Sequence, residues 1–155
     1  MTKEVKKYLK YANLQMASEA LLDRIPQVGL EKVLTEGNNR SSRFTQTQAD
    51  QFIADGWTVV EHRRNTATGF SGTLFKYTGE TDQSKELIKN QLVLSFRSTE
   101  FIDDAARDNK ATNELEIKET GFAWGQIADM QQWYAELKED GTKLGAGQAF
   151  SVTGY

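Results

Sequence analysis

The first part of the chain carries the hydrophobic spacing of helices. Between residues 8 and 22 apolar side chains recur every three or four positions, which is the spacing of one helix face. The members of this stripe are Leu9, Ala12, Met16 and Ala20, with Tyr8, Ala17 and Leu21 beside them. We interpret the stripe as a packing face, so the pattern predicts a helix that lies with this stripe against the rest of the protein.

Two further helices are expected before residue 57. A short one over residues 30–35 stops at Gly37. The other is expected over residues 46–55, because a capping box, a hydrophobic staple and a left-handed stop frame it. These signals are Thr45 with Gln48, Phe44 with Ala49, and Gly56.

After residue 56 the pattern changes to strands. Residues 57–62 and 69–77 are rich in β-branched and aromatic side chains, and a polar cluster between them is typical of a turn, so we expect a hairpin. Residues 92–96 form a short apolar run of the kind that is buried on both faces in the middle of a sheet.

A long amphipathic helix and a last strand complete the pattern. The helix is predicted over residues 121–137 and the strand, again as a buried one, over residues 149–153. The helix face consists of Phe122, Gln126, Met130, Trp133 and Leu137, with Ile127 and Tyr134 alongside. A strand, a crossover helix and a second strand imply a parallel pair, and therefore an α/β sheet.

Composition limits the classes of function. The 155 residues, 17.5 kDa, suffice for one domain. A formal charge of −3, with no basic block beyond a set of lysines that we interpret as a solvated helix face, argues against a nucleic-acid partner. Those lysines are Lys3, Lys6, Lys7 and Lys10.

The absence of cysteine excludes thiol catalysis, disulfide scaffolds and zinc ribbons. Residues 1–24 contain no apolar run long enough for a signal peptide or a membrane span, so we expect a soluble protein, cytoplasmic or exported without such a signal, with no transmembrane segment.

Several candidate sites have a plainer interpretation that we favour. His62, the single histidine, cannot build a multi-histidine metal site, so a surface or sheet-edge role is preferred to catalysis. Asp103, Asp104 and Asp108 lack the alternating pattern and closing glutamate of a calcium-binding loop, so they are expected in a polar loop. A G-x-G ending at Gly147 precedes a strand, whereas a dinucleotide fingerprint follows one. The sequence thus predicts no metal and no cofactor.

Three remaining segments form a pattern by their order. The strand 92–96 runs into the turn Arg97-Ser98-Thr99, Gly121 opens the long helix, and the last strand enters Gly154-Tyr155. In hydrolases with a nucleophile elbow, G-x-S-x-G follows such a strand, because small residues around the serine permit its strained, exposed conformation. Gly154 and Tyr155 would be the first two positions of that motif, and the serine would be residue 156, just beyond this chain.

This order resembles the amino-terminal half of class 3 lipases, serine esterases of the α/β-hydrolase fold. In that family a strand ending in F-R-G-[ST] precedes a loop with an acidic residue, then a G-F helix, then V-T-G-H-S-L-G-G. The matching residues are Phe96-Arg97-Ser98-Thr99, Asp103-Asp104, Gly121-Phe122 and Val152-Thr153-Gly154-Tyr155. Two departures make the chain a divergent member: Ser98 replaces a glycine, and Tyr155 replaces the histidine that usually precedes the nucleophile.

The resemblance implies a fold and an activity. The fold would be a single, incomplete α/β-hydrolase domain with a mostly parallel sheet that begins with an antiparallel hairpin. Residues 57–155 would form the sheet and crossover helix, and residues 1–56, which carry no family signature, an amino-terminal helical extension. The activity would be that of a lipase or carboxylesterase, acting on a small-molecule or lipid ester and contacting a lipid interface. All three triad members would lie in the remainder of the same polypeptide, because the chain order in this fold is serine, acid, histidine.

The resemblance also assigns site residues. Thr99 matches the position that donates a backbone N–H to the oxyanion, with its hydroxyl as a second donor. Arg97 and Ser98 form the oxyanion turn, with Arg97 as an ion-pairing residue beneath it, while Gly154 and Tyr155 flank the nucleophile elbow. An alternative of another class stays open: a non-catalytic binding or interaction module on a hydrolase half-fold, in which residues 149–155 are an ordinary terminal strand.

Overall fold

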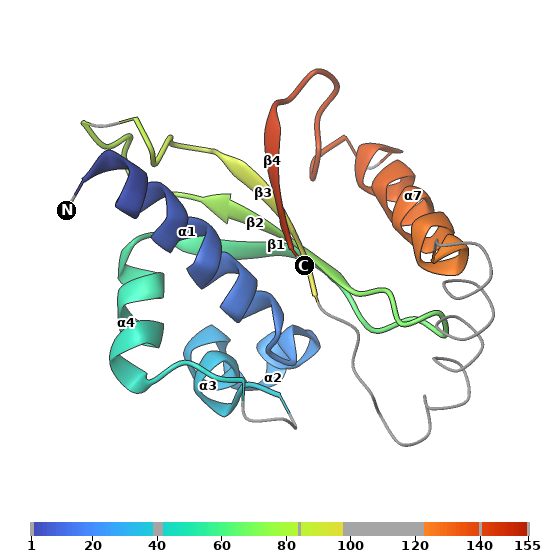
Figure 1. Cartoon of the computed structure of the whole chain (residues 1–155), viewed down its shortest axis with the longest axis horizontal. Helices are drawn as coiled ribbons and strands as arrows, with labels where there is room; N and C mark the ends of the chain where they lie inside the picture. Colours follow the sequence, from blue (N-terminus) through green and yellow to red (C-terminus); the bar gives the residue numbers. More distant parts are fainter. Residues whose placement is uncertain (1, 39–41, 84, 98–122, 140, 155) are drawn as a thin grey trace.

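A four-stranded sheet with helices on both faces forms the centre of the protein (Figure 1). The computed structural model describes residues 2–38, 42–83, 85–97, 123–139 and 141–154. Its elements, in chain order, are α1 (Lys3–Ser18), the 3-10 helix η1 (Leu22–Arg24), α2 (Ile25–Val28), α3 (Leu30–Glu36), α4 (Gln46–Ala54), β1 (Trp57–Arg63), β2 (Gly72–Tyr77), β3 (Leu92–Phe96), α7 (Trp124–Glu139) and β4 (Phe150–Gly154).

The strands lie in the order β1-β2-β3-β4. The pairs β1–β2 and β2–β3 are antiparallel, and β3 and β4 are parallel and joined through α7. The predicted α/β class, the hairpin at the start of the sheet and the parallel pair are therefore confirmed. The described sheet is mixed, however, so a mostly parallel sheet of hydrolase type stays a prediction.

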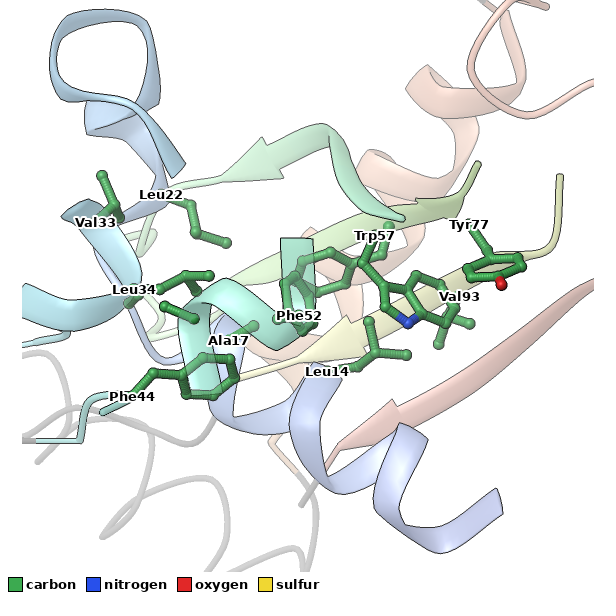
Figure 2. Packing of buried hydrophobic residues seen from close by; sticks show 13 residues of the cluster. Leu14, Ala17, Leu22, Val33, Leu34, Phe44, Phe52, Trp57, Tyr77 and Val93 are labelled. Atoms are coloured by element: carbon green, nitrogen blue, oxygen red, sulfur yellow. The ribbon is translucent and has the colours of Figure 1, made fainter. Parts of the chain in front are cut away.

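Helices α1 to α4 cover one face of the sheet (Figure 1). Figure 2 shows the apolar side chains that converge between these helices and the strands. At their centre the ring of Phe52 makes edge contacts with Phe44, 5.6 Å away, and Phe75, 6.0 Å away. Such buried aromatic pairs contribute about 1 kcal/mol each beyond their area. The Phe52–Phe75 pair joins α4 to β2, and the Phe44–Phe52 pair joins α4 to the segment that precedes it.

Helix α4 has the predicted capping box. The hydroxyl of Thr45 accepts from the backbone N–H of Gln48, and the Gln48 side chain accepts from the backbone N–H of Thr45. After the helix, Gly56 has a φ of +92°, a value that glycine adopts without strain. Local signals in the sequence thus determine both ends of this helix.

The buried face of α1 agrees only in part with the predicted stripe: Ala17 and Ala20 are buried as expected, but Leu14, which the stripe did not include, is at the centre of the contact. Leu14 and Ala17 are fully buried, whereas Leu9, Met16 and Tyr8 of the predicted stripe are 46%, 40% and 71% exposed. Of the lysines predicted to form a solvated face, Lys3, Lys6 and Lys7 are exposed as expected, whereas Lys10 is buried against the loop before β3. They make ion pairs from Lys3 to Glu86 and from Lys6 to Asp82, and hydrogen bonds from the buried Lys10 to the Glu86 carbonyl and to Gln91.

Helix α7 covers the opposite face of the sheet (Figure 1). Trp133 and Leu137 from the predicted helix face are buried there against Phe70, Leu74 and Leu94. Residues 121 and 122, where the helix was expected to begin, lie outside the described residues. Strand β4 forms where predicted but is not buried: it is the last strand of the described sheet, and Val152 is 56% exposed.

Candidate functional site

The carboxyl ends of β3 and β4 lie side by side. Phe96, the last residue of β3, is opposite Gly154, the last residue of β4, and the two strands run in the same direction. In α/β sheets, ligands bind beyond the carboxyl ends of the parallel strands. This edge of the sheet is therefore the candidate site. Two of the three motif segments from the sequence lie here, namely the one that begins after β3 and the one at the end of β4.

Gly154 makes the close approach of the two strand ends possible. Its φ is +152°, and a Cβ at this position would lie 3.0 Å from both the Cβ and the carbonyl oxygen of Phe96. A larger residue would push β4 away from β3 at the point where the strands end. The tight contact and the positive φ thus both favour glycine at this position of the predicted nucleophile elbow.

Most of the site residues assigned from the resemblance lie outside the described residues. These are Ser98, Thr99 and Tyr155, together with the acidic pair Asp103-Asp104 and the helix start Gly121-Phe122. Arg97 and Gly154 are described, and both lie at the carboxyl edge of the sheet. The roles assigned to all of these residues stay predictions.

Arg97 is buried at the end of β3. Its Nε atom lies 3.9 Å from Oε2 of Glu19, which follows α1, and the two side chains are 4% and 6% exposed. Its backbone N–H donates to the carbonyl of Ser71, at 3.1 Å. Burial lowers the pKa of the Arg97 guanidinium, while the nearby Glu19 and Asp23 oppose that shift. Removing one partner of a buried ion pair typically costs about 3–5 kcal/mol, so this pair ties the end of β3 to α1.

The carboxyl-terminal end of α1 holds the end of β3 through further hydrogen bonds. The side chain of Gln15 donates to the carbonyl of Phe96, at 2.8 Å. The hydroxyl of Ser95 bonds to that of Ser18, at 3.1 Å, and both serines are fully buried. Buried polar groups of this kind fix one arrangement, because leaving either unpaired costs about 1–3 kcal/mol.

A polar cavity of about 620 Å³ opens beside Arg97 on the α1 side of the sheet. Two ion pairs stand around it: Arg64 Nε lies 3.3 Å from Asp23 Oδ2, and Arg24 Nη1 lies 2.6 Å from Glu36 Oε2. The cavity is lined by Leu21, Asp23, Arg24, His62, Arg64, Asn65 and Arg97. The charges of its lining are thus largely matched in pairs.

His62 lies in the wall of this cavity. Its Nδ1 is 2.9 Å from the hydroxyl of Thr73 on the neighbouring strand. Burial, with Arg97 and Arg64 nearby, lowers the pKa of His62 from 6.5 to about 4, against the opposing effect of Asp23. The imidazole is therefore neutral at pH 7.

An apolar groove of about 340 Å³ lies on the other face, between α7 and the sheet edge. Its floor is formed by side chains of β3 and β4, and its wall is formed by side chains of α7. Leu94, Phe96, Met130, Trp133, Phe150 and Val152 contribute to the lining. The carboxyl edge of the sheet thus separates a polar cavity from an apolar groove.

Sequence reasoning did not find the contribution of α1 to the site. Gln15, Ser18 and Glu19 lie together at the end of the helix, and Ser95 is the single polar residue in the run 92–96. A polar residue inside a doubly buried strand needs a buried partner, so Ser95 was the signal for a polar contact from the covering helix. The partner itself is about 80 residues away in sequence, which no local pattern specifies.

In the described ranges, no three His, Asp or Glu side chains gather in a way that could hold a metal ion. Among the helices that the structure describes, none is both long and apolar enough to cross a membrane.

Comparison of the chain with protein-family models, with curated proteins and with solved structures finds no match.

Proposed function

We propose that the chain supplies the oxyanion side of the active site of a lipase- or carboxylesterase-type serine hydrolase. The observation that carries the proposal is the parallel pairing of β3 and β4, with Phe96 opposite Gly154 at the carboxyl edge. An acyl-transfer site needs a nucleophile and oxyanion donors within a few ångströms of one carbonyl group. Two strand ends that lie side by side can supply both, one from the turn after β3 and one from the turn after β4.

The chemistry follows from the order of the motifs. A serine at residue 156 attacks the ester carbonyl, and a base later in the polypeptide accepts its proton. The negative charge that develops on the carbonyl oxygen is stabilised by the backbone N–H of Thr99, with the Thr99 hydroxyl as a further donor. The second backbone donor is the N–H of the residue after the serine. Substrates are small-molecule or lipid esters, the class that the resemblance implies.

The contacts of α1 support this assignment. Gln15 and Glu19 hold Phe96, the last residue of β3, and Arg97, the first residue of the predicted oxyanion turn. An oxyanion donor is effective only if it is held in place before the charge develops. Arg97 is accordingly a positioning residue beneath the turn, and the helical region 1–56 supports the site.

The experiment is an ester assay on the polypeptide carried on past Tyr155 by its own coding sequence. We expect Ser-x-Gly from residue 156, hydrolysis of a chromogenic short-chain ester, and no hydrolysis by the 155-residue chain. Thr99→Pro removes one backbone donor and should lower kcat by about 10²–10³-fold. Thr99→Val, which removes the hydroxyl alone, is the matched variant and should cost less.

The opposite results would favour the alternative, a non-catalytic interaction module. A residue other than serine at position 156 removes the nucleophile from the account. Hydrolysis by pure 155-residue protein would contradict the mechanism as well, because this chain supplies no nucleophile in the proposed site.

A further inference from the structure

The surface of the polar cavity carries more positive than negative charge. Among the described residues of its lining there are three arginines and one carboxylate, that of Asp23, which gives a formal net charge of +2. The arginines are Arg24, Arg64 and Arg97. Two further carboxylates pair with arginines of this set, Glu36 with Arg24 and Glu19 with Arg97, but neither is among the described lining residues. They hold the guanidinium groups from outside the cavity, so the positive charge of the lining faces inward.

The charged groups of the lining differ in how firmly they are held. Arg97 is buried at the end of β3 with Glu19 beside it. Arg64, which follows β1, has a side chain that is 78% exposed, and its partner in the lining is Asp23. Exposed ion pairs of this kind contribute little to stability. A stronger acceptor in the cavity can therefore replace the Asp23 carboxylate on Arg64 at little cost.

His62 adds a hydrogen-bonding group that is uncharged at pH 7. Its Nδ1 is 2.9 Å from the hydroxyl of Thr73. The other ring nitrogen, Nε2, has no hydrogen-bond partner among the described residues, and His62 is part of the cavity lining. A neutral imidazole offers one donor and one acceptor. When Nδ1 accepts from Thr73, the Nε2–H group can donate to an oxygen atom in the cavity.

We propose that this cavity binds a phosphate group, either that of a small phosphate monoester or free phosphate. A phosphate monoester carries a charge of about −1.5 to −2 at pH 7, which matches the +2 of the lining. The planar guanidinium group of arginine binds phosphate through two parallel hydrogen bonds, and Arg24 and Arg64 can supply such bonds. The cavity volume of about 620 Å³ lies within the roughly 300–1,000 Å³ that is usual for small-molecule sites. It leaves room for an organic part beside Leu21 and Asn65.

Calorimetric titration of the 155-residue chain at pH 7 tests the proposal with inorganic phosphate and with glycerol 3-phosphate. We expect one site per chain, with a Kd of about 1 mM or tighter. Tighter binding of glycerol 3-phosphate would identify a monoester as the ligand, and equal binding would identify free phosphate. Acetate, which has a single charge, should bind about tenfold more weakly or less.

Single substitutions test the position of the site. Arg64→Gln and Arg24→Gln should each weaken binding of glycerol 3-phosphate about tenfold or more, because each removes a charged donor. Both side chains are exposed, so these variants should fold normally. Arg63→Gln is the matched control. It removes the same charge from the residue next to Arg64, but Arg63 pairs with Glu136 on the α7 face of the sheet, so binding should not change.

A substitution of the opposite sign tests the role of charge. Asp23→Asn removes the carboxylate of the described lining and should tighten binding about threefold or more, because the repulsion of the phosphate is lost. Glu61→Gln removes a carboxylate from β1 that pairs with Lys143 instead, and it should leave binding unchanged.

The imidazole signals of His62 report on the cavity directly, since the chain has no other histidine. Glycerol 3-phosphate should shift these signals at pH 7, whereas sodium chloride at the same ionic strength should not. A bound anion also favours the imidazolium form. At saturation it should raise the pKa of His62 from about 4, the value set by burial together with Arg97, Arg64 and the opposing Asp23.

Three results would overturn the proposal. The first is an absence of saturable heat and of any shift in the His62 signals up to about 10 mM glycerol 3-phosphate. The second is equal binding by Arg64→Gln and Arg63→Gln, which would place the anion elsewhere. The third is weaker binding by Asp23→Asn. None of these measurements involves ester hydrolysis or residues beyond Tyr155, so the proposed function and this proposal can fail separately.

Discussion

Protonation of His62 should destabilise the fold in a defined pH window. The imidazole is held neutral in the wall of the polar cavity, and its pKa is lowered from 6.5 to about 4 by burial, then by Arg97 and Arg64, with Asp23 opposing. Between these two values the unfolded chain binds a proton that the folded chain does not bind. The contribution of the neutral imidazole to the free energy of unfolding is therefore fully present above pH 6.5 and is lost progressively as the pH falls toward 4.

The magnitude follows from the size of the shift. One pKa unit corresponds to about 1.4 kcal/mol, so the full window amounts to about 3 kcal/mol and the part between pH 6.5 and pH 5 to about 2 kcal/mol. This is a substantial fraction of the roughly 5–15 kcal/mol that stabilises an ordinary domain. Carboxylates also titrate as the pH falls, so a variant must isolate the contribution of His62.

The assay is urea unfolding of the natural chain and of His62→Gln at pH 7 and pH 5. Glutamine keeps a polar group within reach of the Thr73 hydroxyl but does not titrate. The natural chain should lose about 2 kcal/mol more than the variant between the two pH values. Because His62 is the only histidine, its imidazole NMR signals can be assigned without ambiguity and should not shift between pH 8 and about pH 5.

Two outcomes would refute this reasoning. One is a titration of the His62 signals near pH 6.5, which would mean that burial and the arginines do not hold the ring neutral. The other is an equal loss of stability in the natural chain and in His62→Gln, which would place the pH dependence in other groups.

Two further predictions concern the ends of elements. Gly154→Ala should destabilise the chain by about 1–3 kcal/mol, because its Cβ would lie 3.0 Å from Phe96; Gly145→Ala, where a Cβ has ordinary contacts, is the control, and equal melting temperatures would contradict the account. Thr45→Ala should lower the free energy of unfolding by about 1 kcal/mol by removing the capping hydroxyl. Thr47→Ala, the same change inside the first turn of α4, should have a smaller effect, and a larger one would show that the cap is not what stabilises this helix end.

The elements that the sequence predicted correctly are those specified by nearby residues. The capping box before α4, the β-branched and aromatic residues of β1 and β2, and the apolar run of β3 each act within a few positions. The parallel pairing of β4 followed from connection length, because a long helix between two strands favours a parallel crossover. None of these predictions depended on contacts that are distant in sequence.

The errors concern what distant parts of the chain place against an element. Helix α1 presents its lysine side to the loop before β3, and Lys10 hydrogen-bonds to residues 76 and 81 positions away, so periodicity alone could not select its buried face. For β4, the sequence predicts a strand from its side chains, but its burial depends on whether a neighbour covers it. The contacts that support the candidate site were missed for the same reason, because they join residues that are distant in sequence: Glu19 and Arg97 are 78 positions apart.

The most direct test of the central claim is labelling with a fluorophosphonate, a reagent that modifies activated serines. The polypeptide carried on past Tyr155 should be labelled at a single serine, which mass spectrometry should locate at residue 156, and Thr99→Pro should slow the labelling by about 10²-fold or more. Absence of label from a folded protein, or label on a serine within residues 1–155, would contradict the proposal that the ends of β3 and β4 build an ester-hydrolase site.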